Sequence, residues 1–263
     1  MGVLTAALLG LLQGLTEFLP VSSSGHLVLA QSLMRDFEQP GLLFDTMLHL
    51  ATLFAVLLYF REKVRVLVLS LLGIFSQEYK VMYFENKRFL WGIIIASIPT
   101  AVVGLGLEST VEGMFATPSY VGYFLILTSV LLVLSDKVRT VGEIDGPRSF
   151  LIGIVQGFAV IPGISRSGST VAAGLFLGIK REEMAEFSFL MSVPAIFGAA
   201  ILQIRHLKDV PFEHLPAYGV GMLAAFISGF IAIGFMVFFI KRASLTIFAI
   251  YCLVVGITAI VWM

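Results

Sequence analysis

A cluster of polar side chains between residues 13 and 26 could bind and transform a phosphate group. Gln13 and Glu17 are four residues apart, so both project from one face of a helix. Pro20 ends that helix, and the serines at 22–24, followed by His26, begin another. A carboxylate, hydroxyls and an imidazole at such close spacing are typical of phosphoryl transfer, in which a carboxylate holds a divalent cation or acts as a general base.

The residue types leave several roles open within this first cluster. His26 titrates near neutral pH and could attack phosphorus, activate a hydroxyl or water, or protonate a leaving oxygen. The serines are candidate nucleophiles or phosphate ligands, or they could serve only as helix caps. Glu17 could instead be a structural carboxylate. We predict catalytic roles for Glu17, Ser23 and His26, and substrate-binding roles for Gln13, Ser22 and Ser24.

A second cluster, PGISRSGST at 162–170, places an arginine among hydroxyls where a helix begins. The planar guanidinium of Arg166 matches phosphate oxygens, and a helix N-terminus attracts anions. Two helix N-termini that face one cavity would suit a diphosphate. Arg166 could also be a structural ion-pair partner of Glu17. We predict a catalytic role for Arg166, and substrate-binding roles for Ser165, Ser167 and Thr170.

The two clusters belong to an internal repeat. The sequence GLLQG at 10–14 matches GIVQG at 153–157, and SSSG at 22–25 matches SRSG at 165–168. Three predicted membrane spans separate the copies, and an odd number of spans gives the copies opposite orientations in a membrane. This pattern predicts an inverted-topology repeat.

Composition indicates that a membrane surrounds these clusters. The chain is 58% hydrophobic and 13% charged, which is more apolar surface than a soluble domain of 263 residues could bury. Its formal net charge is zero, which gives no electrostatic case for binding nucleic acid. Six uninterrupted apolar stretches are long enough to cross a bilayer, at 42–60, 89–107, 118–134, 186–204, 217–240 and 245–262.

Two further apolar regions, 1–34 and 149–179, are interrupted in the middle by proline, glycine and serine. Broken backbone at membrane depth is tolerated where protein or a polar cavity surrounds it, so we expect re-entrant helical hairpins whose tips meet near the midplane. Basic residues between 61 and 88 place that segment in the cytoplasm and the N-terminus outside. The predicted fold is an all-α integral membrane domain, 1–263, with six transmembrane helices and two re-entrant hairpins, repeated over about 1–134 and 149–263.

Asp45 and His49, also four residues apart, are second-tier site candidates near the outer end of a span. The main alternative to an enzyme is a polyprenyl-phosphate transporter or flippase, because secondary carriers also combine inverted repeats with broken helices. A transporter needs no leaving-group chemistry. The close spacing of Glu17, His26 and the serines therefore favours the enzyme.

The motifs resemble those of a known family. QGLTEFLPVSSSGH at 13–26 and PGISRSGST at 162–170 are similar to the two signature motifs of the undecaprenyl pyrophosphate phosphatase family, which is also known for bacitracin resistance. FDTMLHLATLFAVLLYF at 44–60 and AEFSFLMSVP at 185–194 fit the same family. The resemblance thus spans nearly the whole chain.

This resemblance implies hydrolysis of undecaprenyl pyrophosphate to undecaprenyl phosphate and inorganic phosphate, which recycles the lipid carrier for peptidoglycan synthesis and confers bacitracin resistance. It places the site at the outer, periplasmic face of the bacterial plasma (inner) membrane. It also implies a divalent metal, Mg²⁺ or Ca²⁺, with Glu17 and Gln13 as ligands. The first acidic position of the family accepts Glu or Gln, and Gln13 leaves Glu17 as the only anionic ligand there. The expected partners are a polyprenyl diphosphate lipid, the membrane and, as an assembly state, a second copy in a homodimer.

Overall fold

The computed structural model describes the chain except residues 35–41, 116, 139, 204–209 and 243. The described part is almost entirely helical and contains no β-strand, which confirms the predicted all-α class. The helices are α1 (Val3–Glu17), α2 (Ser23–Ser32), α3 (Leu42–Tyr59), α4 (Arg61–Leu72), α5 (Lys80–Phe115), α6 (Pro118–Ser135), α7 (Gly146–Phe158), α8 (Arg166–Phe176), α9 (Arg181–Gln203), the short 3-10 helix η2 (Phe212–His214), α10 (Leu215–Arg242) and α11 (Thr246–Trp262).

Several of these helices are suited to a bilayer. Among the described residues, four helical segments are long and apolar enough to cross a membrane: Lys80–Leu107, Pro118–Ser135, Arg181–Gln203 and Phe212–Ile240. The pair α3 and α4 would make a fifth, although it bends by 83°. The predicted sixth span is α11, whose 17 residues lie at the lower end of the roughly 17–25 residues that crossing requires. The chain is therefore a multi-pass membrane protein.

The helix boundaries differ from the predicted spans mainly around the basic segment 61–88. The predicted span 42–60 ends as expected with α3, but the chain then continues as the helix α4 where a loop was expected. Arg61 and Arg65 on α4 are exposed, whereas Leu67 is buried, so this helix is amphipathic. Helix α5 begins at Lys80, before the predicted start at 89, and residue 204, the predicted end of another span, lies outside the described residues.

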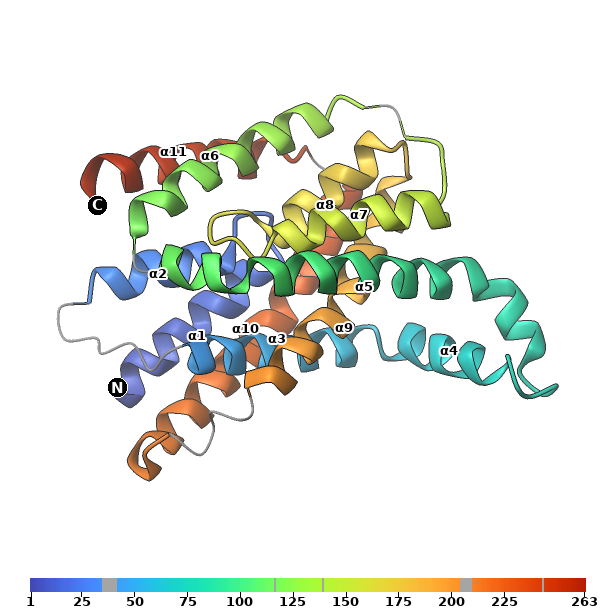
Figure 1. The fold of residues 1–263 in the computed structure, drawn as a ribbon, viewed down its shortest axis with the longest axis horizontal. Helices are drawn as coiled ribbons and strands as arrows, with labels where there is room; N and C mark the ends of the chain where they lie inside the picture. Colours follow the sequence, from blue (N-terminus) through green and yellow to red (C-terminus); the bar gives the residue numbers. More distant parts are fainter. Residues whose placement is uncertain (35–41, 116, 139, 204–209, 243) are drawn as a thin grey trace.

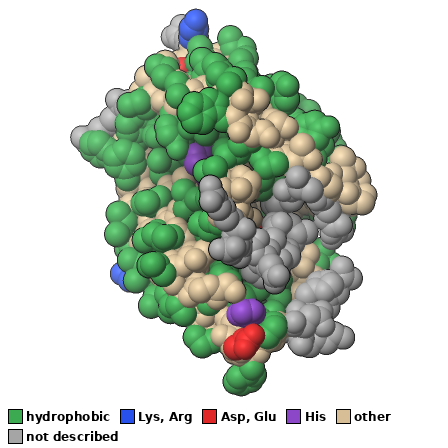
Figure 2. Space-filling view, turned by 90° about the vertical axis from the view of Figure 1, so that its left-hand side faces the viewer, with side chains coloured by type: hydrophobic (Ala, Val, Ile, Leu, Met, Phe, Trp, Pro, Cys, Tyr) green, Lys and Arg blue, Asp and Glu red, His purple; other side chains and the backbone are tan. Residues whose placement is uncertain are grey.

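The ends of the chain and the basic helix lie at opposite ends of the molecule. Figure 1 shows both termini at one end and α4 at the other. Large apolar side chains cover much of the surface, among them Leu4, Val102 and Ile231, each more than half exposed. Figure 2 shows hydrophobic side chains over most of the face that it displays. Such a surface is expected where lipid surrounds the protein.

Both breaks predicted from the sequence are present. Helix α1 stops at Glu17 and α2 begins at Ser23, while α7 stops at Phe158 and α8 begins at Arg166. The first arms of these hairpins, α1 and α7, pack closely on α10 and α5 respectively.

The repeated glycines permit this close packing. A Cβ atom at Gly10 would lie 2.1 Å from the carbonyl oxygen of Gly221 on α10, and one at the repeat-related Gly153 would lie 2.2 Å from that of Ala96 on α5. Each first arm therefore contacts a helix from the other copy of the sequence repeat. The limits of the two repeats remain a prediction.

Candidate active site

The two hairpin tips border one open cavity of about 240 Å³, to which α3, α5 and α9 also contribute side chains. This volume is several times the roughly 30 Å³ that a water molecule occupies in the liquid. The first residues of α2 and α8 line it, so two helix N-termini face the same space. The polar lining residues are Glu17, Ser22, Ser23, Ser24, Thr46, His49, Thr100, Gln156, Ser165, Arg166 and Ser192.

The serines at the start of α2 and α8 cap these helices in the same way. Ser22 Oγ accepts a hydrogen bond from the amide of Gly25 at 3.3 Å, and Ser165 Oγ accepts one from Gly168 at 3.0 Å. The cap therefore satisfies an otherwise free backbone N–H group in each hairpin. Ser22 itself has a φ angle of 68°, which a residue with a side chain rarely adopts. Such strain is often found at functional sites.

The two tips are bonded directly to each other. The amide of Gly163 donates a hydrogen bond to Ser22 Oγ at 3.0 Å, and Ser167 Oγ donates one to the carbonyl of Leu19 at 3.0 Å. The Thr128 hydroxyl on α6 also donates to the carbonyl oxygen of Gly163 at 2.9 Å. These contacts hold the two broken segments together, as the sequence repeat predicted.

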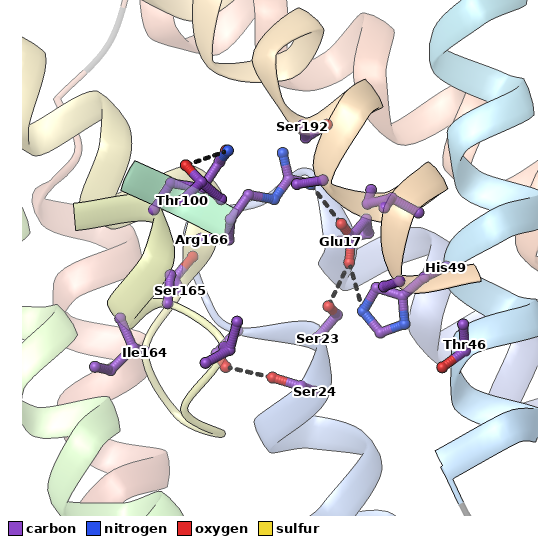
Figure 3. Close-up of a pocket in the computed structure, with 17 residues that line it drawn as sticks. Glu17, Ser23, Ser24, Thr46, His49, Thr100, Ile164, Ser165, Arg166 and Ser192 are labelled. Carbon is purple, nitrogen blue, oxygen red and sulfur yellow. Dashed lines mark hydrogen bonds and ion pairs between the residues drawn. The ribbon is translucent and has the colours of Figure 1, made fainter. Parts of the chain in front are cut away.

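Glu17 is the centre of the polar contacts. Its Oε1 lies 2.5 Å from Nη2 of Arg166, and its Oε2 accepts hydrogen bonds from Ser23 Oγ at 2.5 Å and from Gln13 Nε2 at 3.0 Å. His49 Nε2 lies 3.3 Å from the same Oε2. Figure 3 shows Ser23 and His49 on the Glu17 side of Arg166. These contacts hold the carboxylate in a fixed position.

The predicted site residues divide into two groups. Glu17, Ser23 and Arg166, three of the four predicted catalytic residues, line the cavity, as do the predicted binding residues Ser22, Ser24 and Ser165. The lining does not include Gln13, Ser167 or Thr170. Their side chains contact Glu17, the carbonyl of Leu19 and Ser188 respectively.

His26 points away from the cavity. Its Nδ1 lies 2.8 Å from the carbonyl oxygen of Ser22, and its Nε2 lies 2.8 Å from the hydroxyl of Tyr251 on α11, with the two rings stacked. The imidazole that approaches Glu17 is instead that of His49, a second-tier candidate from the sequence. A catalytic role for His26 remains a prediction that this geometry does not explain.

Four further polar residues of the cavity were not among the predicted site residues. Thr46 lies one turn before His49, Ser192 lies in the AEFSFLMSVP segment, and Gln156 is the repeat partner of Gln13. The repeat itself was thus a signal for Gln156. Thr100, on α5, had no comparable signal.

A larger, mainly apolar groove adjoins the cavity. Its volume is about 590 Å³, and Thr46, Thr100, Val160, Ala195 and Ala199 line both spaces. The rest of its lining comes mainly from α5 and α9 and includes Leu105, Val111 and Leu202. A ligand with a polar head and an apolar tail could therefore occupy the two spaces together.

The fold and the cavity define a class of protein: a helical membrane protein with a cavity that contains Arg166 and two helix N-termini, beside an apolar groove. Comparison with known families then identifies the family to which the chain belongs. The chain belongs to the family described as bacitracin resistance protein BacA, whose model matches residues 6–258.

Three relatives show how far this similarity extends. The chain is 42% identical to the undecaprenyl-diphosphatase of Methanobrevibacter smithii over 98% of this chain and 96% of that protein. It is 41% identical to the protein of the same name from Syntrophotalea carbinolica, over 97% of each chain. It is also 41% identical to that of Moorella thermoacetica, over 100% of this chain and 99% of the relative. The similarity thus includes both hairpins and all the helices between them.

Proposed function

We propose that this protein is an undecaprenyl-diphosphate phosphatase, which releases inorganic phosphate from the lipid and returns undecaprenyl phosphate to the cycle that carries cell-wall precursors. The observation that carries the proposal is the cavity shared by the two hairpins, where Arg166 and two helix N-termini favour a diphosphate and Glu17 lies beside a serine hydroxyl. The family and the names of the relatives agree with it. Resistance to bacitracin follows from the same reaction.

The arrangement in the membrane is part of the proposal. We place six spans across the plasma membrane, with the two hairpins re-entering from opposite sides and the N-terminus outside. The position of both termini at one end of the molecule is what six crossings require, and the basic α4 at the other end suits the cytoplasm (Figure 1). The cavity would then open to the outer face.

Ser23 is the best-placed nucleophile. Its hydroxyl donates to Glu17, so this carboxylate can accept the proton as Ser23 Oγ bonds to the terminal phosphorus. The bond from that phosphorus to the bridging oxygen breaks, and undecaprenyl phosphate leaves with the electron pair. Arg166, whose side chain is 15% exposed, can turn a donor towards the phosphoryl oxygens and stabilise the charge on them.

The residues beside Glu17 fit a divalent cation as a cofactor. The amide nitrogen of Gln13 donates to the Glu17 carboxylate, and the amide oxygen of Gln13, just behind the cavity lining, is buried and has no hydrogen-bond partner. Such oxygen donors suit Mg²⁺ or Ca²⁺, which would neutralise charge on the phosphate oxygens. The described residues contain no group of three or more His, Cys, Asp or Glu side chains that could hold a metal. Water and substrate would therefore supply most of the ligands, as is usual for Mg²⁺.

The apolar groove suits the first part of the polyprenyl tail. It continues from the cavity along α5 and α9, and its lining is rich in alanine, glycine and leucine. The substrate never leaves the bilayer, so its tail can enter such a groove directly from the lipid.

The proposal can be tested with purified protein in detergent. We expect release of inorganic phosphate from undecaprenyl diphosphate, loss of this release with a chelator, and recovery on adding Mg²⁺ or Ca²⁺. Glu17→Ala and Arg166→Ala should each reduce release by at least about 100-fold. A folded wild-type protein that releases no phosphate with any divalent cation would contradict the proposal, and lipid transport would then be measured in its place.

A further inference from the structure

The amide oxygen of Gln156 is a polar atom that the proposed reaction has not yet used. Gln156 lies on α7, is 3% exposed and lines the cavity. Its Oε1 atom is buried and has no hydrogen-bond partner. A buried acceptor without a partner costs free energy, on the order of 1–3 kcal/mol. Its presence in a site therefore points to a ligand that supplies the missing donor.

The direction of this amide is fixed by its nitrogen. Nε2 donates to Thr100 Oγ1 at 3.2 Å and to the carbonyl oxygen of Met191 at 3.3 Å. The single hydrogen of the Thr100 hydroxyl has two carbonyl acceptors within reach, Ala96 at 2.8 Å and Gly153 at 2.9 Å, so Thr100 faces the amide as an acceptor. A flipped amide would bring its oxygen against two acceptors, which excludes that orientation.

Gln156, a residue of the cavity lining, therefore keeps one hydrogen-bond acceptor without a donor. An ionised phosphate oxygen is also an acceptor and cannot satisfy it. A water molecule can, because it donates one hydrogen to the amide oxygen and keeps a lone pair free. The ligand that fits Gln156 is thus a water molecule rather than the phosphate itself.

The position of Gln156 suits a water that attacks phosphorus. Figure 3 shows Thr100, the residue that fixes Gln156, on one side of Arg166, and Glu17 with Ser23 on the other. In-line displacement puts the attacking and leaving oxygens on opposite sides of phosphorus. A phosphoryl group on Ser23 would accordingly be attacked from the Thr100 side. Thr100 and Val160 also border the groove, so the departing lipid phosphate would vacate this same side.

We propose that Gln156 positions the water molecule that hydrolyses a phosphorylated Ser23. In this step the water oxygen bonds to phosphorus while the bond to Ser23 Oγ breaks. Glu17 returns to Ser23 Oγ the proton that it took in the first step, and the proton lost by the water stays on the released phosphate. The inference rests on the proposed function, since it concerns the second half of the same reaction.

The test is pre-steady-state kinetics of Gln156→Leu beside the wild type. We expect kcat to fall by about 100-fold, because misplacing a reacting group by about 1 Å can cost this much. KM should fall with it, so that kcat/KM, which depends only on the steps up to release of undecaprenyl phosphate, stays within about twofold. Undecaprenyl phosphate should appear in a burst equal to the enzyme concentration, ahead of inorganic phosphate. Mass spectrometry of the quenched variant should find the phosphate on Ser23.

Two further variants separate positioning from folding. Thr100→Val keeps Gln156 but removes one acceptor of its nitrogen, so an intermediate loss of kcat with some phosphorylated Ser23 is expected. Ser149→Ala, on the same helix α7, removes another buried side-chain oxygen that has no hydrogen-bond partner and does not line the cavity, and its kcat should stay close to that of the wild type. Its thermal midpoint shows what loss of a buried, unpartnered oxygen does to stability alone.

The other outcomes would overturn the inference. A lower kcat without phosphorylated Ser23, or a higher KM at unchanged kcat, would show that Gln156 does not serve this water. A Gln156→Leu variant as active as the wild type would do the same. In each case a wild type that still releases phosphate leaves the proposed function standing, whereas an inactive wild type removes both.

Discussion

Glu17 and Arg166 lie 2.5 Å apart, although 149 residues separate them in the chain. Glu17 ends the first arm of one hairpin, and Arg166 begins the second arm of the other. Their side chains are 4% and 15% exposed, so the pair is largely removed from solvent. This ion pair joins the two halves of the site before any substrate binds.

Breaking this pair should cost stability as well as activity. Loss of one partner leaves a buried charge, which typically costs about 3–5 kcal/mol. We therefore expect Glu17→Leu and Arg166→Met each to lower the midpoint of thermal unfolding in detergent. The double variant should recover most of that loss yet stay inactive. A double variant less stable than both single variants would show that the pair does not act as a unit.

His49 should contribute through its contact with Glu17. We expect His49→Ala to lower phosphate release by about tenfold, because it removes the imidazole whose Nε2 lies 3.3 Å from the Glu17 carboxylate. His49→Gln places an amide group at this position and should keep most of the activity. The comparison is made from kcat values at saturating lipid. Equal activity of the alanine variant and the wild type would assign His49 a structural role.

Filling the apolar groove should affect long lipids selectively. Gly198 lines the groove, and a Cβ there would meet nothing within 4 Å, so Gly198→Leu would place its side chain in open space. We expect KM for undecaprenyl diphosphate to rise by about tenfold, within the range that one or two methylene contacts supply. KM for a short-chain diphosphate should change less. Gly219→Leu, at another open position outside the groove, is the matched control.

The contact between the tips depends on a glycine. Gly163 has a φ angle of +99°, and a Cβ there would lie 2.5 Å from the carbonyl oxygen of Val121. We expect Gly163→Ala to lower stability by about 1–3 kcal/mol and to reduce activity, since the tip must move. Gly219→Ala, which meets no atom within 4 Å, should change neither. Normal unfolding of Gly163→Ala would contradict the importance of this contact.

Acid should weaken the contacts that Asp136, directly after α6, makes with Arg181 and Ser244. Burial raises the pKa of Asp136, but hydrogen bonds from Ser244 and Arg181, with the charge of Arg181, outweigh it and hold the pKa below its usual value. A pKa lowered by folding contributes stability above the unfolded value, roughly pH 4, and this stability is lost as pH falls through the folded value. The thermal midpoint should thus fall on acidification. Asp136→Asn should have a lower midpoint at neutral pH and a smaller dependence on acid.

Much of the site could be predicted because its signals are local. Pro20 and the serine caps determine where the helices break, and the repeated spacing shows that the second hairpin breaks likewise. The inverted orientation of the two copies predicted that these breaks should meet. These predictions needed only periodicity, capping and the cost of burying a charge.

The remaining features depend on contacts between distant helices. His26 is directed away from the cavity by Tyr251 on α11, and no local pattern encodes that contact. His49 reaches Glu17 because α3 packs beside α1, and Thr100 enters the cavity because α5 packs on α7. The bend between α3 and α4 was missed because a basic amphipathic helix and a basic loop have similar composition.

The packing of α1 on α10 also constrains the order in which the protein can be completed. α1 leaves the ribosome first, but the helix that Gly10 contacts begins at Leu215, near the end of the chain. During most of translation, α1 therefore lacks its main neighbour, α10. An incomplete polypeptide would hold all the residues of the first hairpin and still lack the helix against which its first arm packs.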